Sequence, residues 1–155
     1  MLNCDKPDHA WIAAHIPHQG SMCLLDRVTG WDQQHIRCTA VSHRLTSNPL
    51  RSRGQLSTAC GIEYAAQAMA VHGALLAPVD SDPPRSGFLV SVRGATLHVP
   101  RLDDIDADLD IEAVCIHGSG DNILYQFTLH AAGQLLLDGR AAVMLNADII
   151  TGAST

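Results

Sequence analysis

One stretch of the chain, residues 57–77, constrains the fold most strongly because it consists almost entirely of small and apolar residues. Ser57 or Thr58 is a natural N-cap and Pro78 ends the stretch, so we predict one long α-helix. Apolar side chains occupy nearly every side of this helix. If the helix lay on one face of an open sheet, its outer side would expose apolar surface to water. The helix therefore has to be wrapped by the rest of the chain.

The remaining segments predict a sheet that can wrap this helix. A short helix over residues 8–15 is expected to stop before Pro17, whereas residues 43–56 and 80–86 lack a regular pattern. Hairpin turns are expected at 118–121 and 132–133. Six segments have the composition of β-strands: residues 22–31, 35–42, 88–99, 109–117, 123–131 and 134–146. We predict an α+β fold of the hotdog type, in which a curved antiparallel sheet of about six strands encloses one long central helix. An α+β sandwich would require a more polar outer helix face.

Length and composition favour one globular domain. A chain of 155 residues with 46% hydrophobic residues is expected to form a single domain over residues 1–155, with an N-terminal extension at 1–15 and a loose tail at 147–155. No apolar run is long enough to span a bilayer, and the polar N-terminus is unlike a signal peptide. Five scattered cysteines are typical of reduced thiols, so we expect a cytoplasmic protein with no membrane contact. A net charge of −6 argues against nucleic acid as a partner.

The predicted helix contains one carboxylate, Glu63. An unpaired carboxylate in an apolar environment is unfavourable, and Gln67 lies four residues further on the same helix face. We therefore expect a polar pair in an apolar wall, with a raised pKa on Glu63 that suits general acid or base chemistry near neutrality. A structural pair, or a glutamate that faces solvent, is the alternative.

Two motifs of this chain, one that leads into the first predicted strand and one in the predicted helix, resemble those of a known enzyme family. Residues 17–28 have the sequence Pro-His-Gln-Gly-Ser-Met-Cys-Leu-Leu-Asp-Arg-Val, which resembles the N-terminal signature of the hotdog 3-hydroxyacyl-ACP dehydratase family. Residues 62–67, Ile-Glu-Tyr-Ala-Ala-Gln, resemble its Glu-x-x-Ala-Gln helix, in which the glutamate is catalytic. Together with Asn48-Pro49-Leu50, the helix motif looks most like the branch found in aryl-polyene biosynthesis clusters. The resemblance covers essentially the whole chain in order and spacing.

The resemblance implies that the protein dehydrates 3-hydroxyacyl thioesters on an acyl carrier protein to the enoyl thioester, in aryl-polyene or related fatty-acid or polyketide biosynthesis. Glu63 would be one catalytic residue. The usual catalytic histidine stands fourteen residues before the glutamate, where this chain has Pro49 beside Asn48. His18 is the expected replacement, with His43, Asn48 and Gln67 in supporting positions. Because the usual base is missing, a non-catalytic hotdog subunit stays open as an alternative, as does an acyl thioesterase.

The resemblance also implies where the substrate binds. Backbone N–H groups near Ser57, Thr58 and Ala59, at the start of the helix, would hold the thioester carbonyl. Arg51 and Arg53 are expected to bind the phosphate of the phosphopantetheine arm or the carrier protein, although such a pair can also be a solvated loop. Arg85 and Arg101 are alternates for that role. The phosphopantetheine arm arrives with the substrate, so no cofactor is expected.

The spacing of histidines and cysteines bears on metal binding, and the open edges of the predicted sheet bear on association. No His-x-x-x-His or Cys-x-x-Cys pair is present, so no metal site is expected. Long strands leave open sheet edges, which hotdog domains hide by pairing across a two-fold axis. We therefore expect a homodimer, or a heterodimer with a related hotdog protein. In relatives the glutamate and its catalytic partner come from different subunits.

Overall fold

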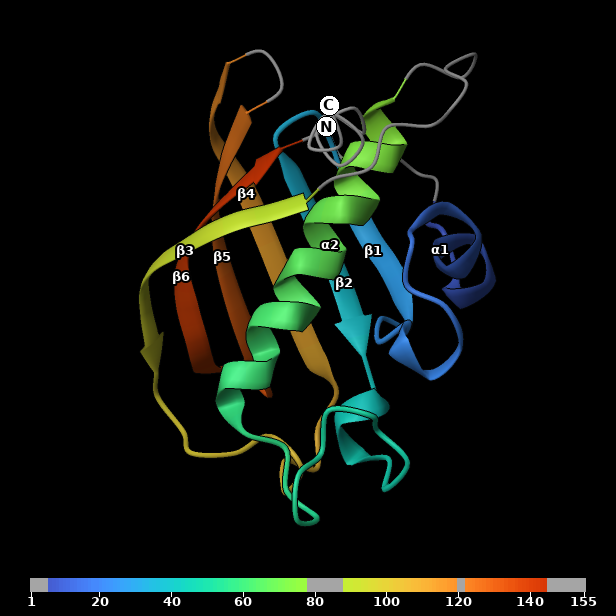
Figure 1. Cartoon of the computed structure of the whole chain (residues 1–155), viewed down its shortest axis with the longest axis vertical. Coiled ribbons are helices and arrows are strands. Elements are labelled where there is room, and N and C mark those ends of the chain that lie inside the picture. The colour runs from blue at the N-terminus through green and yellow to red at the C-terminus, as the bar shows by residue number, and fades with distance from the viewer. Residues whose placement is uncertain (1–5, 78–87, 120–121, 145–155) are drawn as a thin grey trace, which may run out of the picture.

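The computed structural model describes residues 6–77, 88–119 and 122–144. Its helices are α1 (His9–His15) and α2 (Gly61–Leu76), and short 3-10 turns occur at η1 (Gly20–Met22), η2 (Ser42–Arg44) and η3 (Thr58–Cys60). The strands are β1 (Arg27–Trp31), β2 (His35–Ala40), β3 (Phe88–Leu97), β4 (Leu109–Ser119), β5 (Asn122–Ala131) and β6 (Gln134–Met144). They form one antiparallel sheet in the order β1-β2-β4-β5-β6-β3, and the sheet curves around α2 (Figure 1).

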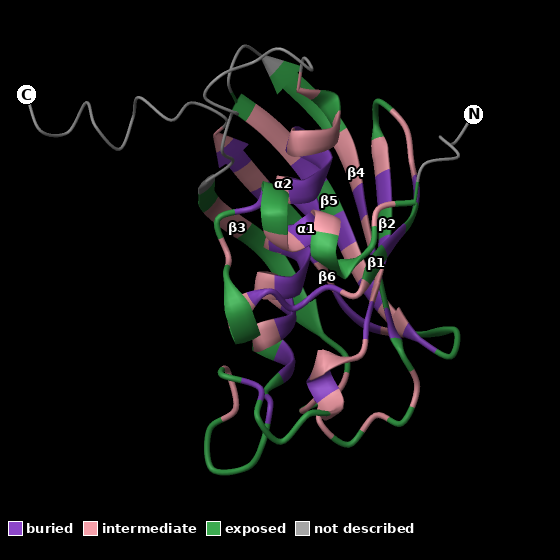
Figure 2. Ribbon diagram, turned by 90° about the vertical axis from the view of Figure 1, so that its right-hand side faces the viewer, coloured by how far each residue is buried: buried purple, intermediate pink, exposed green. Residues whose placement is uncertain are grey.

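Helix α2 is buried along most of its length, as the apolar sequence requires. Tyr64, Ala65, Ala68 and Met69 are at most 1% exposed, and the helix packs against β2, β4 and β5 (Figure 2). At its first residue, Gly61, an added Cβ would lie 2.8 Å from methyl groups of two leucines on β5 and β6. Glycine therefore allows the helix to approach the sheet closely. The predicted hotdog fold is confirmed, and no described helix is long and apolar enough to cross a membrane.

The observed starts of β1 and α2 differ from the predicted ones. β1 begins at Arg27 and not at residue 22, because Cys23, Leu24 and Leu25 are buried as a non-strand segment after η1. The helix begins as a 3-10 turn at Thr58 before it becomes α-helical at Gly61. The predicted short helix is present as α1, and the Asp8 side chain caps it. The predictions for residues 80–86 and 147–155 lie outside the described residues.

Candidate active site

The structure brings His18 and Glu63 into direct contact. The Nε2 atom of His18 lies 3.0 Å from Oε1 of Glu63, and their side chains are 25% and 33% exposed. His18 precedes η1 and Glu63 lies in the first turn of α2, so residues 45 positions apart in the chain meet at the surface of the helix. Both members of the predicted pair come from one chain. The site is therefore accessible and unites an acid and a base in one hydrogen bond.

Gln67 holds the segment that follows His18 against α2. Its side chain is fully buried, its Oε1 accepts from the backbone N–H of Leu24 at 2.9 Å, and its Nε2 donates to the carbonyl of Met22 at 2.7 Å. At the other end of this segment, Gln19 donates to the carbonyl of Ala13 in α1 at 3.0 Å. These contacts fix the chain on both sides of His18. Gln67, predicted from its spacing to Glu63, is therefore the residue that joins the two sequence motifs.

The pKa of Glu63 is lowered, so the prediction of a raised pKa is wrong. The largest cause is the hydrogen bond from His18; burial acts in the opposite direction, and the attraction of His18 and a hydrogen bond from Gln67 lower the pKa further. The prediction treated the carboxylate as unpaired, whereas tertiary structure supplies a donor from a distant segment. Glu63 is consequently ionised near neutral pH. The Nδ1 atom of its partner His18 is buried and has no hydrogen-bond partner among the described residues.

Asn48 and Tyr64 join the irregular segment after β2 to α2. The Asn48 Nδ2 donates to the Tyr64 hydroxyl at 3.0 Å and to the carbonyl of Ser42 at 2.9 Å, and the Ser42 Oγ lies 2.8 Å from the Tyr64 hydroxyl. The Asn48 Oδ1 accepts from the N–H of Leu50 at 2.9 Å. Burial raises the pKa of Tyr64, so its hydroxyl keeps its proton. The polar role of Tyr64 depends on two distant residues, Ser42 and Asn48, that no local pattern reveals.

His43 lies in a different environment from His18. It is fully buried in η2, and its Nε2 donates to the carbonyls of Ile105 at 3.1 Å and Ala107 at 2.9 Å. Burial lowers the pKa of His43, which favours the neutral form. Among the described residues, no hydrogen bond joins His43 to Glu63 or His18. The structure thus places His43 as a brace between η2 and the segment before β4.

The N–H groups at the start of the helix already have partners within the chain. Thr58 donates to the carbonyl of Pro100 at 3.3 Å, Ala59 donates to Oγ of Ser57 at 3.2 Å, and Cys60 donates to the carbonyl of Ser57 at 2.9 Å. The 3-10 turn η3 explains this difference from the expected free groups, because the capping side chain and the tight turn occupy the first donors. The Oγ1 of Thr58 is buried and has no partner among the described residues.

The arginines predicted to bind the phosphate or the carrier protein differ in their contacts. Arg51 donates to the carbonyls of Gly54 at 3.0 Å and His43 at 3.2 Å and so supports its own loop. Arg53 is exposed, has a positive φ of 54°, and has no hydrogen-bond or ion-pair partner among the described residues. Arg101, one alternate, forms an ion pair with Asp103, which holds the pKa of that carboxyl well below its usual range. Arg85, the other alternate, lies outside the described residues.

No cluster of metal ligands accompanies the pair. Within the described part of the chain, no three His, Cys, Asp or Glu side chains gather closely enough to hold a metal ion. The His18–Glu63 contact allows proton transfer between a carboxylate, an imidazole and a bound substrate.

A family model decides the relationship of this chain to known proteins. The model of the ApeP-like family, described as ApeP dehydratase, matches residues 10–151. The chain belongs to the ApeP-like dehydratase family. The resemblance drawn from the two sequence motifs, including its aryl-polyene branch, is thereby confirmed. No curated protein matches the chain significantly.

Solved structures of ApeP-type and thioesterase proteins share the architecture. The dehydratase heterocomplex ApeI:P from Xenorhabdus doucetiae aligns with a TM-score of 0.76 at 22% identity, over 93% of this chain and 97% of that chain. A thioesterase from Haemophilus influenzae aligns with a TM-score of 0.63 at 12% identity, over 93% of this chain and 94% of that one. A mutant thioesterase from Pseudomonas aeruginosa aligns with a TM-score of 0.64 at 14% identity, over 93% and 97%. These similarities show the common hotdog fold.

Proposed function

We propose that this ApeP-like protein dehydrates 3-hydroxyacyl thioesters carried by an acyl carrier protein, in aryl-polyene or related fatty-acid or polyketide biosynthesis. The single observation that best supports a working site is the 3.0 Å contact between His18 and Glu63 within one chain. It supplies a substitute for the histidine missing beside Asn48. The substrate would arrive on the phosphopantetheine arm of the carrier protein, and the protein would need no further cofactor.

The contact between the two side chains suggests how they divide the reaction. Ionised Glu63 would take the C2 proton while protonated His18 gives a proton to the C3 hydroxyl, which leaves as water as the C2–C3 double bond forms. A proton would then pass from Glu63 to His18 across their hydrogen bond and restore the starting state. The sequence suggested the reverse assignment, with His18 as the base. The lowered pKa keeps Glu63 ionised, as a general base has to be, and the contact between the two side chains places His18 beside it to supply the second proton.

Substrate contacts stay part of the proposal. A thioester carbonyl near Ser57, Thr58 and Ala59 would have to share or displace the N–H bonds that η3 now makes. Arg53, exposed and without a described partner, is better suited than Arg51 to reach a phosphate or an acidic carrier protein. Arg51 would act through the loop that presents Arg53.

A second hotdog chain is the proposed structural partner. The aligned ApeI:P structure is a heterocomplex of dehydratase proteins, which supports pairing with this chain itself or with a related hotdog protein. The alternative function is a non-catalytic subunit that stabilises an active dehydratase. The thioesterase alternative is favoured only by fold, because the aligned thioesterases are at most 14% identical.

The test is an assay of enoyl and free-acid formation from a 3-hydroxyacyl carrier-protein thioester. Glu63→Gln should keep the fold and reduce dehydration about 10²–10⁴-fold, the usual contribution of acid–base catalysis. Glu112→Gln is the matched control, because Glu112 pairs with Arg37 on the outer face of the sheet, away from α2. A loss of less than about tenfold for Glu63→Gln would favour the non-catalytic subunit. Release of free acid in place of the enoyl product would favour the thioesterase.

A further inference from the structure

The hydroxyl of Ser42 joins the segment that follows His18 to helix α2. Its Oγ lies 2.8 Å from the carbonyl oxygen of Leu24 and 2.8 Å from the Tyr64 hydroxyl. The N–H of the same Leu24 donates to the side chain of Gln67. Both backbone polar groups of Leu24 are therefore bound by side chains, one from η2 and one from α2.

The hydrogen bonds around Ser42 have fixed directions. A carbonyl oxygen only accepts, so the single proton of the Ser42 hydroxyl goes to Leu24. Ser42 then accepts from Tyr64, and the Tyr64 oxygen accepts from the Nδ2 of Asn48. The Asn48 Oδ1 accepts from the N–H of Leu50, which fixes the orientation of the amide. The result is one ordered chain of hydrogen bonds from Asn48 through Tyr64 and Ser42 to Leu24.

The 3-10 turn η2 gives this chain of hydrogen bonds a fixed support. Next to Ser42, fully buried His43 contacts two carbonyls of the segment before β4. Arg44 donates to the carbonyl of Asp106 at 2.7 Å and to the carboxylate of Asp108 at 2.6 Å. Ser42 therefore stands on a turn that is tied to a second part of the protein.

The groups that Ser42 binds lie next to both members of the His18–Glu63 pair. Tyr64 directly follows Glu63 in the first turn of α2, so the contacts of its hydroxyl fix the rotation of that turn. Leu24 belongs to the segment that follows His18, and Gln67, which binds Leu24, also donates a hydrogen bond to Glu63. A hydrogen bond such as that of the pair weakens steeply with distance and angle. Its geometry therefore depends on how firmly the two segments are joined.

We propose that Ser42 and Tyr64 are positioning residues that hold His18 and Glu63 at hydrogen-bond distance. They act through the backbone of Leu24 and the first turn of α2. The inference rests on the proposed function, in which the pair transfers protons. Its first readout is the titration of Glu63 without substrate, so its failure is distinguishable from a failure of the proposed dehydratase activity.

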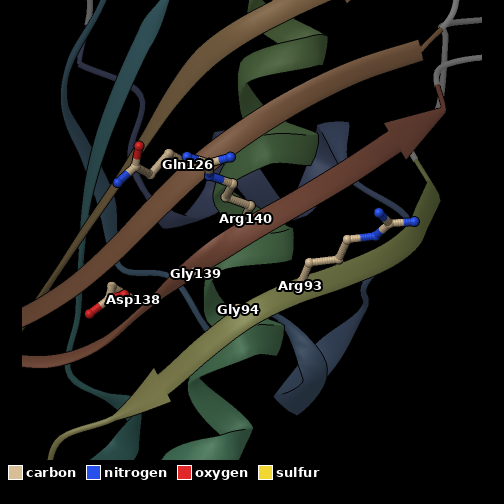
Figure 3. Close-up of a pocket in the computed structure, with 6 residues that line it drawn as sticks. All are labelled: Arg93, Gly94, Gln126, Asp138, Gly139 and Arg140. Carbon is tan, nitrogen blue, oxygen red and sulfur yellow. The ribbon is translucent and has the colours of Figure 1, made fainter.

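The glutamate content of the chain makes this titration simple to observe. The chain contains only two glutamates, Glu63 and Glu112, so protein labelled with ¹³C-glutamate gives two glutamate carboxyl signals. Glu112 stands opposite Thr128, which stands opposite Asp138, so all three lie on the outer face of the sheet. Figure 3 shows Asp138 in the hollow on this face, with α2 behind the sheet. Glu112 is therefore an internal reference remote from the pair.

Tyr64→Phe should raise the pKa of Glu63 toward its ordinary value, because the hydrogen bond from His18 is the largest cause of its lowering. The signal of Glu112 should titrate as it does in the unchanged protein. Ser42→Ala removes the same bridge without altering α2 and should move the Glu63 titration in the same direction. Ser42→Thr keeps a hydroxyl and should restore it.

Tyr125→Phe is the matched control variant. Tyr125 is also a buried tyrosine whose hydroxyl contacts a polar side chain, that of His72 at 2.7 Å, near the other end of α2. Its loss should lower stability, as the loss of a buried hydrogen bond does, and leave the Glu63 titration in place.

Dehydratase kinetics provide the second readout. In Tyr64→Phe and Ser42→Ala, kcat should fall about 10- to 100-fold with a smaller change in KM, as expected for a displacement on the order of 1 Å. The acid limb of the kcat/KM profile should move to higher pH, because Glu63 has to be ionised to act as a base. A Glu63 titration that is unmoved in both variants would overturn the proposal. So would an equal shift of this titration in Tyr125→Phe.

Discussion

Among single residues, the pairing of Glu63 with a histidine matters more than its burial. A carboxylate in an apolar wall is expected to hold its proton, yet the His18 hydrogen bond outweighs burial and lowers the pKa of Glu63. His43, the other histidine near the second motif, is instead committed to two backbone carbonyls. The two histidines should therefore respond differently to removal.

His18→Ala should reduce dehydratase turnover about 10²–10⁴-fold while changing stability little, because the side chain is partly exposed and contacts the reactive carboxylate. His43→Ala should instead lower the free energy of unfolding by about 2–4 kcal/mol, because it leaves a cavity and two buried carbonyls without a donor. Turnover per folded molecule should stay near that of the unchanged protein. Steady-state kinetics and urea unfolding measure the two effects. The opposite ranking of the two variants in turnover would transfer the catalytic role to His43.

Among the secondary-structure elements, α2 is tied to its surroundings by polar side chains on its buried face. Gln67 fixes residues 22–24, and the Tyr64 hydroxyl meets Ser42 and Asn48. Nearer the end of the helix, fully buried His72 contacts the hydroxyl of Tyr125 through Nδ1 at 2.7 Å and the carbonyl of Asp32 through Nε2 at 2.8 Å. Neutral His72 satisfies both partners, as a donor to the carbonyl and an acceptor from the hydroxyl.

His72 should make the protein less stable in mild acid. Burial lowers its pKa in the folded state below the unfolded value of about 6.5, so the unfolded chain binds more protons as the pH falls below that value. Stability should therefore decrease between about pH 6.5 and the lower folded pKa, by at most about 1.4 kcal/mol per pH unit for one group. His72→Gln should flatten this slope in urea unfolding, and His15→Gln, on the exposed side of α1, should not. An unchanged slope in His72→Gln would contradict the assignment.

In the molecule as a whole, the closeness of helix and sheet sets the position of the site. Gly61 begins α2 directly against Leu129 of β5 and Leu137 of β6, and Glu63 follows two residues later. Glu63 lies in the same first turn of α2 as Gly61, so a shift of this turn would move Glu63 relative to His18. Core packing and the geometry of the His18–Glu63 pair are coupled at this point.

Gly61→Val should lower the free energy of unfolding by about 1–3 kcal/mol, because the added methyl groups overlap the two leucines. Dehydratase turnover should fall as well, since the first turn of α2 is displaced. Ala74→Val, at a half-buried position near the other end of the same helix, is the control for placing a valine in α2 away from the two leucines. Denaturant unfolding of both variants measures the difference. Equal stability of the two variants would mean that the helix does not approach the sheet as closely as the structure shows.

Local composition and spacing were enough to predict the elements and the chemistry available to them. An apolar, small-residue helix has to be enclosed, and six strand-like segments can enclose it, so the hotdog fold follows from burial of apolar surface. The motifs at 17–28 and 62–67 contain the residues that meet in the site, His18, Glu63 and Gln67. The boundary of β1 was not predictable in this way, since buried apolar residues such as Leu24 and Leu25 look like a strand whether or not they join the ladder.

Which polar groups meet, and with what charge, depends on tertiary contacts. The contact between His18 and Glu63 requires the segment after α1 to be fixed to α2 through Gln67, across 43 residues of sequence. Segments distant in sequence also have to meet in the contacts of Tyr64 with Asn48, of His43 with the carbonyls before β4, and of His72 with Tyr125. A hydrogen bond depends on angstrom-scale approach, and hydrophobic patterns specify only which side of an element is buried. The direction in which the pKa of Glu63 shifts is therefore decided by its tertiary partner, His18.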